Sequence, residues 1–386
     1  MLNTNNQSQA INKHHKIKVG ITGQSGFMGT HLFNYLAHKD NIILIPFIDS
    51  YFEDSTELES FVKQCDVIVH LAALNRHNEP KIIYDTNIKL VKQLITALEK
   101  TNSNSYVLFS SSIQEEKDNV YGNSKREGRE LFQRWAEKNK TRFTALIIPN
   151  VFGPFGKPFY NSVISTFSYQ IVNKLEPKIE IDASLKLIYI IDLLNIIYDL
   201  IVSEVSPQVY NVPYFKELKV TEILKLLIDF KEVYLNNYSI PRFNDKFELD
   251  LFNTFRSYID LEKFYPVFLK KHEDNRGFLT ELIKENSGGQ IFYSKTKPGI
   301  TRGNHFHTRK IERFCVISGQ AEIKLRKIGN ERIISFKVDG EKPTFIDMPI
   351  WYTHNITNIG NDDLVTLFWC NEIFNPEDPD TYYEEV

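Results

Sequence analysis

The first 148 residues alternate between short apolar runs and amphipathic segments, and this alternation restricts the fold more than any other feature. The apolar runs at residues 16–22, 42–48, 66–72, 105–110 and 143–148 are typical of buried strands. Helical patterns lie between them, most clearly at 81–100 and 123–140. Strands that alternate with helices form right-handed βαβ units, so the sequence predicts an α/β, doubly wound parallel sheet covered on both faces.

A glycine-rich turn follows the first predicted strand. Its glycines have the spacing GxxGxxG and open a helix. The first glycine permits a tight turn, the second lets the backbone approach a pyrophosphate, and the third lets the helix pack closely on the strand. We therefore expect a dinucleotide to bind this turn, through Gly23, Ser25, Gly26, Phe27, Met28 and Gly29.

A tyrosine and a lysine lie four residues apart in the helix predicted at 123–140 or just before it. Tyr121 and Lys125 would share one helix face. A lysine ammonium favours the phenolate and lowers the tyrosine pKa. Such a tyrosine can donate a proton to an alkoxide as a hydride arrives. The serines at 110–112 end the fourth predicted strand, where a hydroxyl could hold the substrate oxygen.

These motifs, together with residues 70–73, resemble the extended short-chain dehydrogenase/reductase family. Its members bind NAD(P) on a Rossmann-like sheet and usually bind nucleotide sugars in a second lobe. The resemblance implies that Ser112, Tyr121 and Lys125 are catalytic, with Ser111 as the alternative serine. It also implies cofactor contacts from Leu71, Ala72, Ala73 and Lys125, and a substrate contact from Asn150 at the end of the fifth predicted strand.

The residue type after the second predicted strand bears on the choice of cofactor. Relatives that prefer NADP usually place Arg or Lys there to meet the 2′-phosphate, whereas this chain has Asp49. Its carboxylate could accept a hydrogen bond from a ribose 2′-hydroxyl, which would favour NAD(H), or it could face solvent. The family resemblance favours NADP(H), which is our expectation, with NAD(H) as the alternative.

The last third of the chain has a different pattern and a cluster of metal-ligand residue types. Short alternating runs separated by turns predict an all-β sandwich or barrel. His305 and His307 would point to one side of a strand, Glu312 returns on the next strand, and His354 follows later. Three imidazoles and one carboxylate suit Zn²⁺ or another divalent transition metal, in a catalytic or a purely structural role.

This spacing resembles both halves of the cupin signature, and residues 274–281 resemble the start of the sugar-nucleotide 3,5-epimerase cupins. The domain order, with stretches such as the tail at 376–382, resembles bifunctional enzymes of capsular polysaccharide and O-antigen synthesis. We expect a disordered leader at 1–15, an extended reductase domain at 16–260 with its substrate lobe at about 150–260, and a C-terminal all-β cupin barrel at 261–386.

The resemblance implies two reactions on a UDP-linked 4-keto amino sugar. The cupin would epimerise C3 of UDP-2-acetamido-2,6-dideoxy-4-hexulose. The reductase would then reduce the C4 ketone with NADPH, which gives UDP-2-acetamido-2,6-dideoxy-L-talose on the path to UDP-N-acetyl-L-fucosamine. Further contacts to the sugar or its phosphates are expected from Asn75, Arg76, Tyr160 and Asn161.

Composition argues against several other classes of protein. A net charge of −3 does not suggest a nucleic-acid partner. The three cysteines lie far apart, no apolar run reaches the roughly 18 residues of a membrane span, and the first residues lack a signal-peptide core. We therefore expect a cytoplasmic protein that does not insert into membranes. The resemblance further suggests a homodimer whose cupin strands join edge to edge.

Two other functions stay open at this point. One is an NAD-dependent nucleotide-sugar epimerase or dehydratase, and the other is a catalytically inactive sensor. A dehydratase usually needs an acid beside the serine, whereas Ile113 and Gln114 follow the serines here. The acids Glu115 and Glu116 are nevertheless close in sequence. The pattern favours a reductase.

Overall fold

The computed structural model describes residues 16–269, 271–274, 277–280, 289–372 and 374–386. The predicted leader at 1–15 and part of the epimerase-like segment at 274–281 lie outside these residues. The chain divides into two compact units, residues 1–147 with 196–211, and residues 148–195 with 212–386. The domain boundary predicted near residue 260 stays a prediction.

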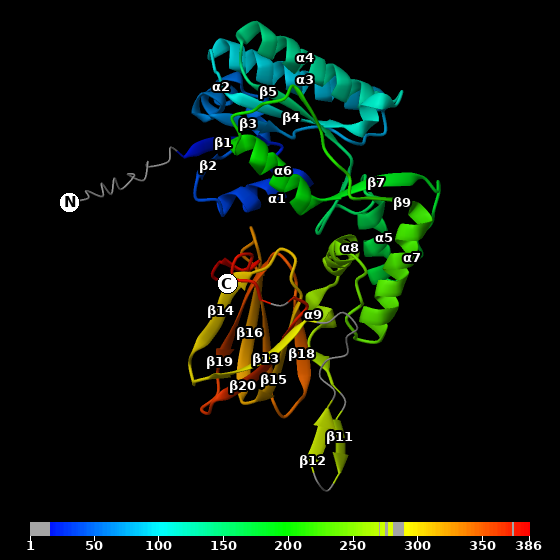
Figure 1. The fold of residues 1–386 in the computed structure, drawn as a ribbon, viewed down its shortest axis with the longest axis vertical. Coiled ribbons are helices and arrows are strands. Elements are labelled where there is room, and N and C mark those ends of the chain that lie inside the picture. Colours follow the sequence, from blue (N-terminus) through cyan, green and yellow to red (C-terminus); the bar gives the residue numbers. More distant parts are fainter. Residues whose placement is uncertain (1–15, 270, 275–276, 281–288, 373) are drawn as a thin grey trace, which may run out of the picture. The chain divides into compact units, whose positions relative to one another are not determined.

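The first unit contains the predicted parallel sheet, with strand order β2-β1-β3-β4-β5-β8 (Figure 1). The strand order reverses at β1, and ligands of open α/β sheets bind beyond the carboxyl ends of the strands at such a point. The second strand ends earlier than predicted, because Pro46 follows it and has no N–H for the ladder. The strands are β1 (Ile17–Thr22), β2 (Ile42–Ile45), β3 (Val67–His70), β4 (Tyr106–Ser112), β5 (Phe143–Ile148) and β8 (Val209–Asn211).

Helices cover both faces of this sheet. On one face, Phe61, Val91 and Phe132 from three helices pack into one apolar core. On the other face, Tyr35 of α1 packs edge-on against Tyr198 of α6, and Figure 1 shows these two helices opposite the other three. The helices are α1 (Phe27–Ala37), α2 (Ser55–Gln64), α3 (Pro80–Lys100), α4 (Val120–Asn139) and α6 (Ile190–Val202), with the short turns η1 (Asp49–Phe52) and η2 (Ile113–Glu116).

The second unit begins with a helical lobe and a small sheet ordered β6-β7-β9. Helix α7 is amphipathic, and its buried face consists of Val220, Ile223, Leu227 and Phe230. Helix α8 is instead buried on all sides over residues 250–256. The elements are β6 (Asn150–Phe152), α5 (Val163–Val172), β7 (Ser184–Tyr189), β9 (Lys216–Lys219), α7 (Val220–Phe230), η3 (Lys231–Asn236), α8 (Lys246–Arg256) and α9 (Leu261–Phe264).

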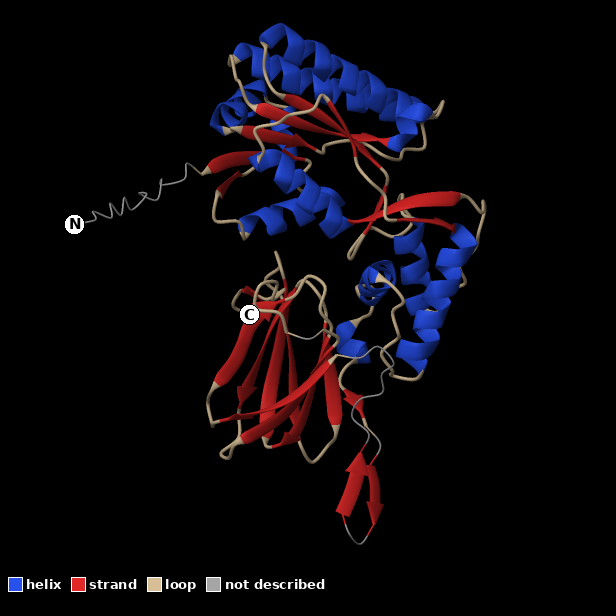
Figure 2. Ribbon diagram, viewed as in Figure 1, coloured by secondary structure: helices blue, strands red, loops and turns tan. Residues whose placement is uncertain are grey.

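Two five-stranded antiparallel sheets follow, drawn in red in Figure 2. Along β16, Ala321, Ile323 and Leu325 are buried and alternate with more exposed residues, the period expected of a strand with one face in a core. The first sheet is β10 (Val267–Phe268), β18 (Thr344–Met348), β15 (Glu312–Ser318), β20 (Leu364–Cys370) and β13 (Gln290–Thr296). The second is β17 (Ile333–Asp339), β16 (Gln320–Lys327), β19 (Tyr352–Asn358), β14 (Thr301–Phe306) and β21 (Tyr382–Tyr383), and a hairpin joins β11 (Lys271–Asp274) to β12 (Gly277–Thr280).

A buried ionic network joins the helical lobe to the first antiparallel sheet. The guanidinium of Arg313 contacts both carboxylate oxygens of Asp347 at 2.7 and 3.0 Å, and both side chains are almost fully buried. The hydroxyl of Tyr234 donates to the same carboxylate and lies 2.5 Å from the hydroxyl of Tyr265. Arg256 of α8 donates to the carbonyl of Met348 at 2.9 Å. Most polar groups of the network therefore have partners inside the core, although one terminal nitrogen of Arg256 is buried without a hydrogen bond.

Two expectations from composition can be compared with the structure. No helix in the described part of the chain is long and apolar enough to span a membrane. All three cysteines are buried and unpaired.

Candidate functional sites

The glycine turn between β1 and α1 has the geometry expected of a phosphate-binding turn. Gly23 has φ +69°, and a Cβ there would lie 2.7 Å from the backbone of Ala72. A Cβ at Gly29 would lie 2.2 Å from the carbonyl oxygen of Gly23, so only glycine lets the helix pack this closely. The Leu71 N–H donates to the Thr22 carbonyl at 3.1 Å, which holds residues 71–73 beside the turn.

Asp49 lies beside this turn. The Ser25 hydroxyl donates to its carboxylate at 2.7 Å. The carboxylate therefore contacts the glycine turn and does not point only into solvent, which was the other possibility left open by the sequence. A carboxylate in this place can accept from a ribose 2′-hydroxyl and repel a 2′-phosphate.

Tyr121 and Lys125 lie together on α4, as predicted from their spacing. The ammonium of Lys125 lies 5.7 Å from the centroid of the Tyr121 ring and donates to the Ser110 carbonyl at 2.8 Å. Lys125 is 3% exposed, and this burial lowers its pKa to about 7, partly opposed by the Glu115 charge. The helix begins at Val120 because the Asn119 side chain accepts from the Gly122 N–H at 2.8 Å.

The three serines at the end of β4 have different environments. Ser110 donates to the His70 carbonyl at 3.1 Å, and Ser111 donates to Glu115, so both buried hydroxyls have a partner within the core. Ser112 is half-buried and accepts from the Gln114 N–H at 3.2 Å, which leaves its own proton to donate. This difference supports Ser112 over Ser111 as the serine that meets substrate.

Gly122 allows the turn after Ser112 to pack closely against the helix that carries Tyr121. A Cβ there would lie 2.0 Å from the Gln114 carbonyl oxygen, so η2 packs directly against the first turn of α4. The short sequence gap between Ser112 and Tyr121 therefore still brings the end of β4 to the start of α4.

Glu115 is the nearby acid that would suit a dehydratase. Its buried carboxylate pairs with Arg129 at 2.9 Å and accepts from Ser111. A carboxylate held by these two partners is a structural group, because proton abstraction would require it to leave both of them. Glu116 is exposed.

The substrate residues predicted for the first unit follow β3. Asn75 is half-buried and Arg76 exposed. The loop before them is held by Asn87 of α3, whose Oδ1 accepts from the Leu74 N–H at 2.7 Å and whose Nδ2 donates to Ser124 at 3.0 Å. Sequence reasoning missed Asn87; its only signal is an asparagine on the apolar face of a helix.

The other predicted substrate residues lie in the second unit. Asn150 opens β6 instead of ending β5, and its amide donates to the Lys186 carbonyl at 3.0 Å. Tyr160 is half-buried beside Lys157, whose ammonium lies 5.5 Å from its ring centroid, and Asn161 is exposed. The roles of these residues in binding stay predictions.

The predicted metal ligands converge in the second unit. One ligand atom from each of His305, His307, Glu312 and His354 lies within 4.8 Å of every other. His305 lies on β14, His307 directly follows it, and His354 lies on β19, whereas Glu312 begins β15 of the other antiparallel sheet. The two sheets therefore meet at this cluster.

The donor atoms of the cluster fit a cation. The Nε2 atoms of His307 and His354 lie 3.0 and 3.3 Å from the Glu312 carboxylate, yet none of these buried atoms makes an aligned hydrogen bond. The Nδ1 atoms of the same imidazoles lie 2.5 and 3.2 Å from the carbonyls of Asp380 and Tyr352. A carbonyl only accepts, so Nδ1 carries the proton and the Nε2 lone pairs face the centre, as metal ligands require.

The charges of the cluster also favour a cation. Burial opposes ionisation of Glu312, but the neighbouring His307 and His354 hold the pKa of its carboxyl well below the usual range. Burial, reinforced by the other two imidazoles, lowers the pKa of His305 to about 4. Burial opposes the charged form of His307, but the Glu312 charge outweighs it and raises the pKa of that imidazole. A Zn²⁺ ion or a similar cation would therefore displace a proton from this site when it binds.

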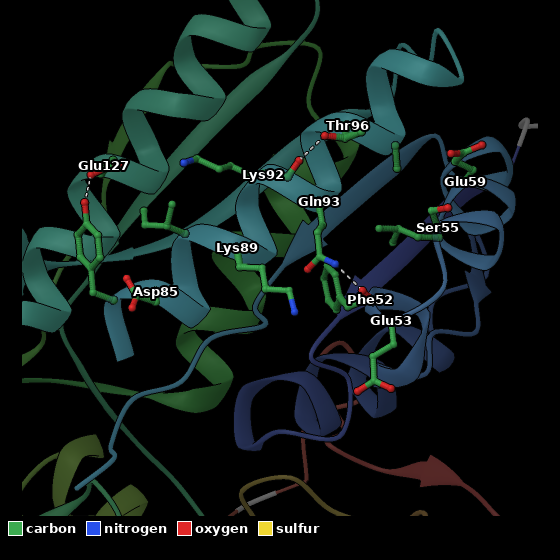
Figure 3. Close-up of a pocket in the computed structure, with 14 residues that line it drawn as sticks. Phe52, Glu53, Ser55, Glu59, Asp85, Lys89, Lys92, Gln93, Thr96 and Glu127 are labelled. Carbon is green, nitrogen blue, oxygen red and sulfur yellow. Dashed lines mark hydrogen bonds between the residues drawn. The ribbon is translucent and has the colours of Figure 1, made fainter. Parts of the chain in front are cut away.

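A separate cavity of about 720 Å³ opens in the first unit between η1, α2 and α3 (Figure 3). Phe52, Leu58 and Ile88 contribute its apolar lining, and Lys89 and Lys92 are among its charged residues. The Gln93 side chain donates to the Phe52 carbonyl at 2.5 Å. Neither the glycine turn nor the Tyr121–Lys125 pair belongs to this lining, so the cavity is not the predicted active site.

Comparisons with known proteins agree with both parts of the chain. Residues 19–212 match the NAD dependent epimerase/dehydratase family, and residues 272–382 match the polysaccharide biosynthesis C-terminal domain. A UDP-2-acetamido-2,6-beta-L-arabino-hexul-4-ose reductase from Pseudomonas aeruginosa is 33% identical over 370 residues, which are 95% of this chain and 98% of the relative.

Two further similarities cover different shares of the chain. The spore coat polysaccharide biosynthesis protein SpsL of Bacillus subtilis is 26% identical over 122 residues, which are 29% of this chain and 81% of SpsL. The crystal structure of the capsular polysaccharide assembling protein CapF from Staphylococcus aureus matches with a TM-score of 0.62 at 35% identity. That match covers 96% of this chain and 100% of the CapF chain.

Proposed function

We propose that this chain modifies a UDP-linked 4-keto amino sugar at two sites. The chain belongs to the NAD dependent epimerase/dehydratase family, and over nearly its whole length it belongs to the group of relatives that includes CapF. In our proposal a cupin-type C-terminal domain epimerises C3 of UDP-2-acetamido-2,6-dideoxy-4-hexulose. The N-terminal domain then reduces the C4 ketone, which gives UDP-2-acetamido-2,6-dideoxy-L-talose for polysaccharide synthesis.

The pairing of Tyr121 with the buried ammonium of Lys125 is the observation that carries the reductase assignment. Tyr121 donates its phenolic proton to the C4 oxygen, and Lys125 stabilises the phenolate that forms. Ser112 donates a hydrogen bond to the same oxygen and orients the ketone. The glycine turn, residues 71–73 and Lys125 would hold NADP(H) or NAD(H), and the bound nicotinamide supplies the hydride.

The metal cluster supports a second chemical step. His305, His307, Glu312 and His354 would hold the ion, and a bound Zn²⁺ supplies Lewis acidity toward a ketone oxygen. The C4 ketone already acidifies the proton on C3, so removal of that proton and its return to the opposite face invert the centre. Three of the four candidate ligands lie on β14, β15 and β19, and His307 directly follows β14.

The exposed edge of one antiparallel sheet supports a homodimer. Strand β13 ends the sheet that contains β15, and Ile291 and Tyr293 on it are 61% and 72% exposed. An apolar edge strand is a template for pairing with another chain. We propose that two copies join along this edge, and size-exclusion chromatography with light scattering of Ile291→Lys would report monomers if they do.

The reductase is tested with the UDP-4-keto sugar and NADPH or NADH, by following the loss of nicotinamide absorbance. Tyr121→Phe removes the proton donor, and we expect kcat to fall by about 10²–10⁴-fold. Tyr198→Phe is the matched control, because Tyr198 lies on α6 and its hydroxyl donates to the Asn41 side chain at 3.0 Å. Absence of turnover by the wild type with either cofactor would refute the reductase assignment.

A further inference from the structure

The C-terminal segment that follows Asn375 lies against the strand and loop that carry two of the candidate metal ligands. Strand β21 pairs antiparallel with β14, with Tyr383 opposite His305 and Tyr382 opposite Phe306. The Thr353 hydroxyl, next to His354 in sequence, donates to the Glu384 carbonyl. The segment therefore contacts residues at or next to three of the candidate ligand histidines, all within the second unit.

Asp380 is a buried residue of this segment whose carboxylate accepts several hydrogen bonds. It is 2% exposed and has φ +40°, a backbone conformation that few residues other than glycine adopt. One carboxylate oxygen accepts from the Thr308 N–H at 3.0 Å and the Thr308 hydroxyl at 2.6 Å. The other accepts from the N–H groups of Arg309 and Lys310, both at 2.9 Å.

These donors lie in the short connection between two candidate ligands. Residues 308–310 directly follow His307 and precede Glu312. The backbone carbonyl of the same Asp380 accepts from Nδ1 of His307 at 2.5 Å. One buried residue thus holds the imidazole by its main chain and the connection to the next ligand by its side chain.

The carboxylate of Asp380 is satisfied by peptide and hydroxyl donors, whereas nearby cations pair elsewhere. Arg309 pairs with Glu372 and Asp378 at 3.2 and 2.9 Å, and the Lys310 ammonium donates to the Pro379 carbonyl. An anion that accepts four such hydrogen bonds holds their donors more strongly than a neutral acceptor would. The geometry of residues 307–310 therefore depends on this one carboxylate.

We propose that Asp380 is the positioning residue of the metal centre. It keeps His307 in the tautomer with the proton on Nδ1 and fixes the path from His307 to Glu312, so that their donor atoms face each other before an ion binds. Asp380 itself touches neither ion nor substrate in this proposal and acts through His307. The inference rests on the proposed metal centre.

The substitution Asp380→Asn tests this role with almost no change in volume. The amide oxygen can still accept from Thr308, but the amide nitrogen would face the N–H groups of Arg309 and Lys310. We expect a loss of Zn²⁺ affinity of about 10–100-fold, the usual effect of removing a partner of a metal ligand. Asp378→Asn is the matched control, because Asp378 lies two residues away and its carboxylate pairs with the Arg309 side chain.

The experiment measures the Zn²⁺ dissociation constant of the full chain by competition with a chromophoric chelator, and the visible spectrum of the Co²⁺-substituted protein. Weaker binding and an altered Co²⁺ spectrum in Asp380→Asn alone support the proposal. Equal values in Asp380→Asn and Asp378→Asn overturn it. If the wild type binds no Zn²⁺, the proposed metal centre itself fails, which is a different result.

A second variant covers the case in which Asp380→Asn does not fold. Thr308→Val removes the 2.6 Å bond from the Thr308 hydroxyl and leaves the three backbone donors in place. We then expect a smaller loss of Zn²⁺ affinity, of about threefold to tenfold, with an unchanged unfolding midpoint of the metal-free protein. A fall in that midpoint with unchanged affinity would show a purely structural role and overturn the proposal.

Discussion

The Lys125 ammonium lies 5.7 Å from the centroid of the Tyr121 ring in a buried position, where its pKa falls to about 7. An unfolded lysine has a pKa of about 10.4. Between these values the unfolded chain binds more protons than the folded one, so this group makes the free energy of unfolding rise with pH. Below pH 7 the lysine is charged in both states and its contribution is constant.

This linkage predicts how a Lys125→Met variant differs from the wild type. As pH rises from about 7 to about 9.5, the wild type should gain stability relative to the variant, and below about pH 7 the difference should be flat. Urea unfolding at a series of pH values measures it, with the exposed Lys138→Met as control. Parallel stability curves for wild type and Lys125→Met across this range would contradict the lowered pKa.

Removal of metal should destabilise the second unit. With free Zn²⁺ about 100-fold above its dissociation constant, binding to the folded state alone stabilises it by about 2.7 kcal/mol. We expect a chelator to lower the unfolding midpoint and added Zn²⁺ to restore it. Glu312→Gln should lose this response, whereas His77→Asn, at an exposed histidine outside the cluster, should keep it. Identical midpoints of the metal-free and metal-loaded wild type would refute the prediction.

The position of Asp49 predicts an effect on cofactor choice. Its carboxylate lies 2.7 Å from the Ser25 hydroxyl in the glycine turn, where it would repel a 2′-phosphate. We expect Asp49→Asn to tighten NADPH binding by about tenfold or more, because about 1.4 kcal/mol of repulsion is a tenfold change in affinity. NADH binding should change little or weaken. Fluorescence titration of both cofactors measures the ratio, and an unchanged ratio would place Asp49 outside the cofactor site.

The buried pair of Arg313 and Asp347 predicts a large loss of stability on substitution. Asp347→Asn leaves the Arg313 charge in the core without its partner, which typically costs about 3–5 kcal/mol. Asp260→Asn removes an exposed partner of Lys263 and should cost less than about 1 kcal/mol. Urea unfolding of both variants compares them, and similar small losses would show that the buried pair contributes little.

The periodic elements could be predicted closely from sequence. The predicted strand at 143–148 matches β5 in both bounds, and the predicted helix at 81–100 matches α3 to within one residue. Their signal is local, since side-chain spacing follows the period of the element itself. The convergence of His305, His307, Glu312 and His354 was also predictable, because two of these residues alternate at strand spacing and a third lies at the start of the next strand.

What the sequence did not predict depends on partners that are distant along the chain. Nothing in the local sequence distinguishes Asp347 and Asp380 from solvated aspartates. Asp347 is buried because it pairs with Arg313, and Asp380 is buried because it accepts from residues 308–310. Strand β21 is two residues long, too short for a period, and exists because β14 offers it an edge. Such contacts arise from tertiary packing, which local patterns do not encode.

The segment that pairs with β14 is synthesised after the candidate metal ligands. The histidines and glutamate of the cluster leave the ribosome before Asp380, because synthesis runs toward the C-terminus. Until the last residues dock, His307 lacks the carbonyl that fixes its tautomer and residues 308–310 lack their acceptor. In a nascent chain the site would therefore stay incomplete until Asp380 has been synthesised and has docked against residues 307–310.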